Sequence, residues 1–166
     1  MVRKYFNWKL IIVLVIGLVV FGLTAYGLRQ WQRNRKVEQG FVLGNKAYDE
    51  HKWQDAAENL GKYLSVVADD VPVLLKYAKA QLNIRPVKRE NIQQAIAAYR
   101  IVLRVDPNNC DAAGQLVALY LAIGTPGEAE LIATRYLEKN QNYEIRRLLA
   151  TAMVQQRKFA GAVSQL

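Results

Sequence analysis

Hydrophobic and polar positions divide the chain into two parts. Residues 10–28 form an uninterrupted apolar run, LIIVLVIGLVVFGLTAYGL, that contains no charged side chain. From about residue 37 onward, apolar residues recur every three to four positions, and no stretch alternates with a period of two. The second pattern is typical of short amphipathic helices, whereas a half-buried strand would alternate. The sequence therefore predicts an all-α chain with two kinds of helix.

The apolar run predicts a single transmembrane helix. Its 19 residues would extend about 28 Å at 1.5 Å per residue, close to the thickness of a bilayer's hydrocarbon core. A lone segment in lipid must satisfy its own backbone hydrogen bonds, which favours a helix. We therefore predict a basic head over residues 1–9, a transmembrane helix over 10–28 and a basic juxtamembrane segment over 29–36.

The location of the charge supports the same interpretation. The formal net charge is +9, and residues 1–36 contain seven basic residues and no acidic one. These are Arg3, Lys4, Lys9, Arg29, Arg33, Arg35 and Lys36. Basic residues beside an apolar span are attracted to anionic lipid headgroups, so the bilayer is the partner expected for residues 10–28. The remaining chain lacks the concentrated basic stripe of nucleic-acid-binding proteins, so no nucleic-acid partner is expected.

These features predict a single-pass protein of the inner or plasma membrane with an N-terminal anchor. Basic residues lie on both sides of the span, so the positive-inside rule is nearly balanced. A short basic head before a lone anchor is typical of an exported domain, which favours the extracytoplasmic side for the remaining chain. The alternative is a cleaved signal peptide, because Ala25-Tyr26-Gly27 resembles a cleavage site, although the apolar run is long for one.

The amphipathic part contains a repeated pattern. Four segments each place an alanine directly after a turn: Lys52–Ala56, Glu90–Ala95, Gly124–Ala129 and Lys158–Ala162. Ala95 and Ala129 are 34 positions apart, and Ala129 and Ala162 are 33 apart. A fixed period of this length indicates stacked helix-turn-helix units. An alanine at the crossing lets two helices approach to about 8–10 Å.

Residues 37–166 resemble the tetratricopeptide repeat (TPR) family. Leu43-Gly44 matches the Leu-Gly pair of its first helix, Trp53 and Phe159 match the aromatic residue of its turn, and Tyr99 matches its second-helix aromatic. The four alanines match its small crossing residue, and Asp106-Pro107-Asn108-Asn109 matches its closing turn. The resemblance implies an α-solenoid of helix pairs. We place units near residues 37–69, 71–109 and 110–142, with a partial unit over 143–166.

The repeat pattern is irregular in two places, a longer turn in the second unit and an incomplete fourth unit. Residues 84–90 lengthen the second unit's turn by about five residues, and Pro86 with its basic neighbours predicts an exposed loop. This loop is either an inert insertion or a docking element. The fourth unit stops inside its second helix at Leu166, which predicts further chain or a covering partner.

The resemblance also implies which residues meet a partner. In this family the first helix of each pair lines a concave groove that takes an extended peptide or a helix. By position, the groove residues here are Phe41, Asn45, Tyr48, Leu75, Lys79, Leu82, Gln115, Ala118 and Leu121. The expected partner is therefore a protein or peptide. The alternative role for each of these residues is packing between repeats.

No motif predicts catalysis. The sequence contains no glycine-rich phosphate loop, nucleophile elbow or zinc pattern. His51 is the only histidine and Cys110 the only cysteine, so we expect no metal, no cofactor, no catalytic residue and no small-molecule substrate. The predicted function is a membrane-tethered TPR scaffold or adaptor in a membrane or envelope complex. The alternatives are the N-terminal part of a larger TPR-containing enzyme or secretion component, and a secreted soluble TPR protein with a cleaved signal.

Overall fold

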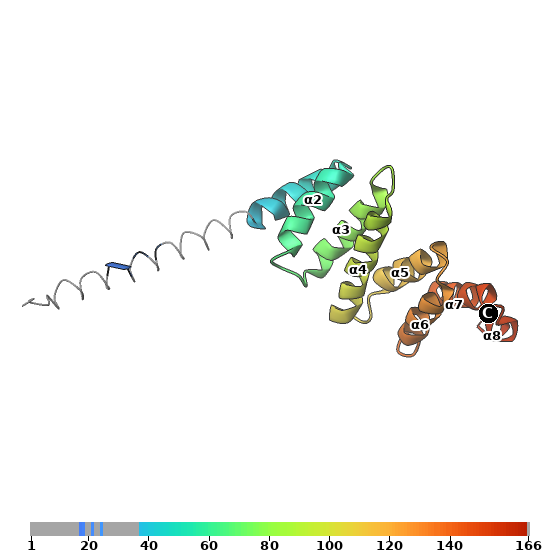
Figure 1. Ribbon diagram of the computed structural model, residues 1–166. Helices are drawn as coiled ribbons and strands as arrows, with labels where there is room; N and C mark the ends of the chain where they lie inside the picture. Colours follow the sequence, from blue (N-terminus) through green and yellow to red (C-terminus); the bar gives the residue numbers. More distant parts are fainter. Residues whose placement is uncertain (1–16, 19–20, 22–23, 25–36, 166) are drawn as a thin grey trace, which may run out of the picture. The chain divides into compact units, whose positions relative to one another are not determined.

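A computed structural model describes residues 17–18, 21, 24 and 37–165 of the chain (Figure 1). The chain divides into two units, residues 1–39 and residues 40–166. All regular secondary structure in the described residues is helical, and they contain no strand. The prediction of an all-α chain is therefore confirmed for this part of the protein.

The second unit is a series of short helices joined by turns. A helix covers residues 37–49, and residues 40–49 of it belong to this unit. The helices that follow are α2 (Trp53–Leu64), α3 (Val71–Asn83), α4 (Arg89–Val105), α5 (Cys110–Ala122), α6 (Pro126–Leu137), α7 (Tyr143–Gln155) and α8 (Phe159–Ser164). From α2 onward each helix packs against the next, and α5 also packs against α7. We call the helix over residues 37–49, α3, α5 and α7 the first helices of their pairs, and α2, α4, α6 and α8 the second helices.

Three of the first helices, α3, α5 and α7, begin with a side-chain cap of the same kind. Asp70, Asn109 and Asn142 precede α3, α5 and α7, and each side chain accepts a hydrogen bond from the backbone N–H three residues later. Such a cap satisfies a donor that has no partner inside the helix and contributes about 1 kcal/mol. The second helices α2, α6 and α8 have no side-chain cap bond. The second helix α4 differs from these, because the Lys88 N–H at its start donates to Asn91 Oδ1 at 3.0 Å.

Small residues lie where paired helices cross. Ala56, Ala95 and Ala129 are completely buried. In the first pair the approach is closest at Gly44, where an added Cβ would lie 2.9 Å from the backbone nitrogen of Leu60 and closer still to its side chain. Any larger residue at Gly44 would push the two helices apart, because this neighbour is backbone and cannot rotate away.

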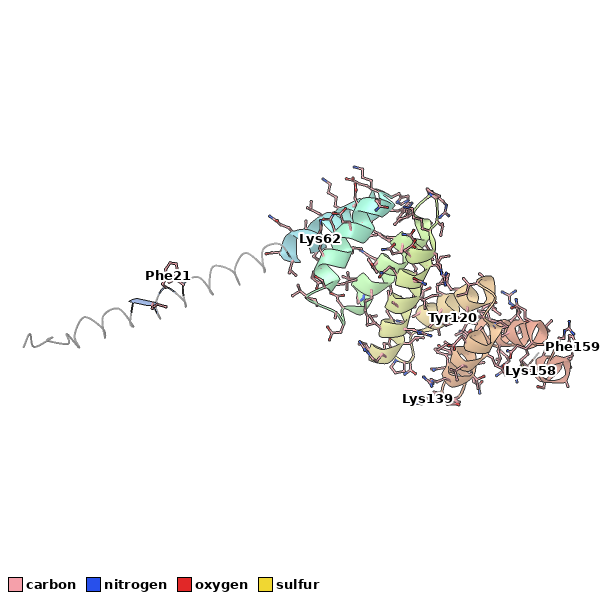
Figure 2. All side chains as sticks on the ribbon, in the orientation of Figure 1. Phe21, Lys62, Tyr120, Lys139, Lys158 and Phe159 are labelled. Carbon is pink, nitrogen blue, oxygen red and sulfur yellow. The ribbon has the colours of Figure 1, made fainter. Side chains whose placement is uncertain are left out.

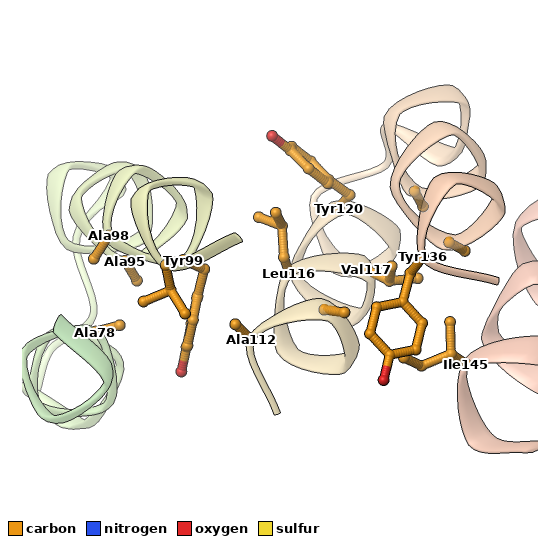
Figure 3. Packing of buried hydrophobic residues seen from close by; sticks show 14 of the residues in the cluster. Ala78, Ala95, Ala98, Tyr99, Ala112, Leu116, Val117, Tyr120, Tyr136 and Ile145 are labelled. Atoms are coloured by element: carbon orange, nitrogen blue, oxygen red, sulfur yellow. The ribbon is translucent and has the colours of Figure 1, made fainter. Parts of the chain in front are cut away.

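The buried residues form two clusters. The larger one runs from Leu74 on α3 to Ala152 on α7, and the smaller one joins Ala47, Ala56, Ala57 and Ala80 beneath aromatic side chains. In the close view of the larger cluster, Tyr99 extends from α4 into the space between Ala78 of α3 and Ala112 of α5 (Figure 3). A second-helix side chain thus fills the interval between two first helices.

The connection between α3 and α4 is exposed. Helix α3 ends at Asn83, and α4 begins at Arg89. The side chains of residues 85–88 between them face solvent. The exposed loop expected over residues 84–90 is therefore present, although its last two residues belong to α4.

The predicted transmembrane helix lies mostly outside the described residues. Of residues 10–28, the structure describes Gly17, Leu18, Phe21 and Thr24, which are helical, with Leu18 and Phe21 exposed. The basic segments predicted over residues 1–9 and 29–36, and the possible cleavage site at residues 25–27, also lie outside the described residues.

The predicted localisation is contradicted. In the part of the chain that the structure describes, no helix is both long and apolar enough to cross a membrane. The longest helix with defined bounds, α4, has 17 residues and carries four charges, on Arg89, Glu90, Arg100 and Arg104. The assignment to the inner or plasma membrane, with repeats on the extracytoplasmic side, depended on one apolar run, and no described helix repeats that character. The bilayer as a partner has no support from the described residues.

Candidate functional site

The predicted groove residues all lie on first helices. Phe41, Asn45 and Tyr48 are on the helix over residues 37–49, Leu75, Lys79 and Leu82 are on α3, and Gln115, Ala118 and Leu121 are on α5. We call the surface formed by these residues with Lys76 and Asp111 the first-helix face. Its side chains fall into three groups: those that bridge neighbouring helices, those that pack inward, and those that face solvent.

A lysine joins the first two of these helices. The Lys76 ammonium donates a hydrogen bond to Asn45 Oδ1 at 2.5 Å and lies 5.5 Å from the centroid of the Tyr48 ring. The Asn45 amide nitrogen donates to the Phe41 carbonyl at 2.9 Å, which leaves the amide oxygen directed at the lysine. The structure thus brings Asn45 and Tyr48 together around a cation, because an ammonium is attracted to both an amide oxygen and an aromatic face.

A second lysine joins α3 to α5. Lys79 Nζ lies 2.8 Å from Asp111 Oδ2, and the two side chains are 41% and 44% exposed. Water screens such a pair, so its contribution to stability is small, about 0–1 kcal/mol. Its effect is geometric, because it holds a cation and a carboxylate on the solvent side of two adjacent first helices.

Helix α4 contributes a buried hydroxyl between α3 and α5. Tyr99 is fully buried, and no described group forms a hydrogen bond with its hydroxyl oxygen. Burial raises the pKa of Tyr99 strongly, and the negative charge of Asp111 raises it further. The hydroxyl is therefore neutral, and the Tyr99 ring lies between Ala78 of α3 and Ala112 of α5 (Figure 3), the two first helices that Lys79 and Asp111 connect.

The remaining predicted residues do not form contacts of this kind. Leu75, Leu82 and Leu121 are half-buried and pack against the large cluster, so packing between repeats accounts for them. Gln115 and Ala118 are exposed on α5. Phe41 stacks at an angle on Tyr63 of α2, with 5.1 Å between the ring centroids.

Two contacting residues were absent from the sequence prediction. They are Lys76 and Asp111. Lys76 precedes Lys79 by three positions, so the two lie on one side of α3, and this spacing was the available signal. No sequence spacing indicates that Asp111 contacts Lys79, because this contact depends on how successive pairs stack.

The tyrosine of the first pair anchors a turn. The Tyr63 hydroxyl donates to Asp70 Oδ2 at 2.8 Å, while Asp70 Oδ1 accepts from the Val73 N–H at the start of α3. This hydrogen bond to the carboxylate raises the pKa of Tyr63. The second helix of one pair thereby fixes the beginning of the next first helix, and with it the position of Lys76 and Lys79.

The residues with metal-binding or nucleophilic chemistry have structural contacts. The His51 ring stacks on Trp53 with 5.0 Å between centroids. The Cys110 sulfur accepts a hydrogen bond from the Asn142 amide at 3.0 Å. Within the described residues, no three histidine, cysteine, aspartate or glutamate side chains are grouped so that they could hold a metal ion.

Comparison with solved structures identifies the fold. No protein-family profile and no curated protein sequence matches this chain. Among solved structures, MamA is similar with a TM-score of 0.64 and 20% identity, over 78% of this chain and 73% of that one. A MamA structure from Desulfovibrio magneticus RS-1, beginning at its residue 41, gives a TM-score of 0.62 and 16% identity, over 78% and 71%.

A third similar structure carries the repeat family in its description. TTC0263, a thermophilic TPR protein of Thermus thermophilus, matches with a TM-score of 0.53 and 18% identity, over 92% of this chain and 85% of that one. At these identities the likeness concerns the fold alone. Together with the paired helices and the buried crossing alanines, it shows that the chain has a tetratricopeptide-type fold.

Proposed function

We propose that this protein is a scaffold that binds a protein partner, as an extended peptide or a helix, across the first-helix face. The observation that carries the proposal is the pair of bridges that Lys76 and Lys79 form between consecutive first helices. They place ammonium, amide, carboxylate and aromatic groups next to one another on the solvent side of three helices.

These groups suit a polypeptide ligand. A peptide presents carbonyl oxygens and N–H groups at short intervals, and the first-helix face offers donors on Lys76 and Lys79 and acceptors on Asn45 and Asp111. Hydrogen bonds that involve a charged group are the stronger class, at about 1.5–3 kcal/mol each. Exposed Gln115 and Ala118 on α5 extend the surface without obstructing it.

The test is capture of the partner by the full chain. The partner is first recovered by crosslinking and purified, and its affinity is then measured for the wild-type protein and for Lys76→Gln/Lys79→Gln. We expect the double variant to bind at least tenfold more weakly, which corresponds to about 1.4 kcal/mol. Its melting curve should be nearly unchanged, because both lysines are partly exposed.

A matched pair of lysines away from both sites provides the control. Lys52→Gln/Lys62→Gln removes the same charge from exposed positions at the start of α2 and within it and should retain the affinity for this partner. Gln115→Arg adds a bulky cation at an exposed position of the first-helix face, and we expect it also to weaken binding of the partner. Unchanged affinity in both first-helix-face variants would show that the partner binds elsewhere.

A further inference from the structure

A cavity of about 560 Å³ lies between α4 and α6, the second helices of the second and third pairs. These two helices run in the same direction (Figure 1). Leu103 of α4 and Leu131 and Ile132 of α6 form the apolar walls, and Pro107, Leu116 of α5 and Tyr136 complete the apolar lining. Leu131 is 52% exposed, so the cavity is open to solvent along one side.

Four cations surround this apolar strip: Arg100, Arg104, Arg135 and Lys139. Arg100 is already paired, because its guanidinium lies 3.4 Å from Glu128 and 5.5 Å from the centroid of the Tyr120 ring. The other three side chains are exposed, and no carboxylate among the described residues lies within ion-pair distance of them. The cavity therefore has an excess of unpaired positive charge.

The unpaired cations lie at one end of the cavity. Arg104 and Arg135 occupy the last turns of α4 and α6, and Lys139 follows the end of α6. Lys139 is labelled at that end in Figure 2. The partial negative charge of a helix C-terminus stabilises a nearby cation. It does not occupy the outward N–H groups of the two guanidinium ions, which remain free to bind an anion.

We infer that the cavity binds an acidic segment of a protein partner in which carboxylates flank a leucine-sized side chain. The apolar side chain would enter between Leu103 and Ile132, and the carboxylates would meet Arg104, Arg135 and Lys139. Guanidinium groups bind carboxylates with two parallel hydrogen bonds, which gives this end its specificity. The cavity is open along one side, whereas small-molecule sites bury about 70–90% of their ligand. A polypeptide segment that lies across the cavity therefore fits better than a small molecule.

This inference is independent of the proposed function, since it concerns second helices and different cations. The probe is a fluorescein-labelled peptide of alternating leucine and glutamate pairs, measured by fluorescence anisotropy against the full chain. We expect binding that weakens as salt is added, because exposed charges are screened. Arg104→Gln/Arg135→Gln should weaken it at least tenfold, and Leu131→Ser should weaken it severalfold.

Matched variants and peptides separate this site from general charge attraction. Lys52→Gln/Lys62→Gln removes two exposed cations elsewhere and should bind the peptide as the wild type does. A peptide with serine in place of leucine should bind weakly. The inference is overturned if the acidic peptide does not bind at millimolar concentration, or if Arg104→Gln/Arg135→Gln binds it normally. It is also overturned if decanoate, a small molecule with one apolar chain and one carboxylate, displaces the peptide at equal concentration.

Discussion

The first-helix face and the α4–α6 cavity differ in how their cations are partnered. On the first-helix face, Lys76 contacts Asn45 and Tyr48, and Lys79 contacts Asp111. In the cavity, Arg104, Arg135 and Lys139 have no carboxylate partner among the described residues. Paired groups fix the spacing of neighbouring helices and present a preformed surface. Unpaired groups retain their full capacity for an anionic ligand, so the two surfaces suit partners of different charge.

The largest effect is expected from a substitution that disrupts the first-helix face and leaves the α4–α6 cavity intact. Gly44→Ala inserts a Cβ against the backbone of Leu60 and should destabilise the first pair by about 1–3 kcal/mol. Repeats contact mainly their neighbours, so the damage should remain local. Thermal unfolding should show an earlier transition, and the partner of the first-helix face should be lost while the acidic peptide still binds.

Gly114→Ala is the matched control for this prediction. An added Cβ at Gly114 in α5 meets nothing within 4 Å. Replacing a mid-helix glycine by alanine should then stabilise by roughly 0.5–1 kcal/mol. Equal melting temperatures for the two variants would contradict the close crossing at Gly44.

A smaller effect concerns the acid that holds α6 against the last pair. Hydrogen bonds from Lys158 and Gln156 reach Glu130 Oε2 at 2.7 and 2.6 Å. The Lys158 hydrogen bond lowers the pKa of Glu130 below 4.5, and Gln156 adds to this effect. Its stabilising contribution is therefore complete above about pH 4.5 and is lost as the pH falls through the lowered value.

Glu130→Gln should accordingly flatten the acid limb of stability against pH, measured by urea unfolding between pH 5 and pH 3. Glu58→Gln provides the comparison, because the hydrogen bond from Lys62 also lowers the pKa of Glu58, but at a fully exposed position. Its effect on the acid limb should be smaller. An acid limb unaltered by Glu130→Gln would place the bridge between α6 and the last pair in doubt.

The repeat fold was predictable because it depends on local pattern. The crossing alanines and Gly44 each act within one helix pair, and the turn at Asp106-Pro107 joins two helices that are consecutive in the chain, so sequence spacing locates all of them. The Lys79–Asp111 contact joins residues 32 positions apart in different pairs, and its formation depends on the stacking of those pairs. The cavity could not be predicted for the same reason, because its lining combines residues of α4, α5 and α6.

The localisation was the prediction that failed. It was based on the length and hydrophobicity of residues 10–28 and on the basic residues that flank them, and among the helices that the structure describes none is long and apolar enough to span a membrane. The groove residues remain predictions, although Asn45, Tyr48 and Lys79 have contacts that fit a shared surface.

The smallest effect sharpens the contrast between paired and unpaired cations. A double-mutant cycle with Lys79→Met and Asp111→Asn should give a coupling free energy of about 0.2–1 kcal/mol in stability, since the pair is exposed. The corresponding cycle with Arg104→Met and Asp111→Asn should give none. Coupling in the second cycle, or its absence in the first, would contradict the assignment of partners.

Site-specific photocrosslinking tests whether the partner binds at the first-helix face. A photoreactive residue is placed at Gln115 on α5 in one version of the full chain and at Val66, an exposed residue after α2, in another. We expect a partner adduct from Gln115 that disappears when Lys76→Gln/Lys79→Gln is added, and no adduct from Val66. Equal adducts from both positions, or none from Gln115, would contradict binding at this face.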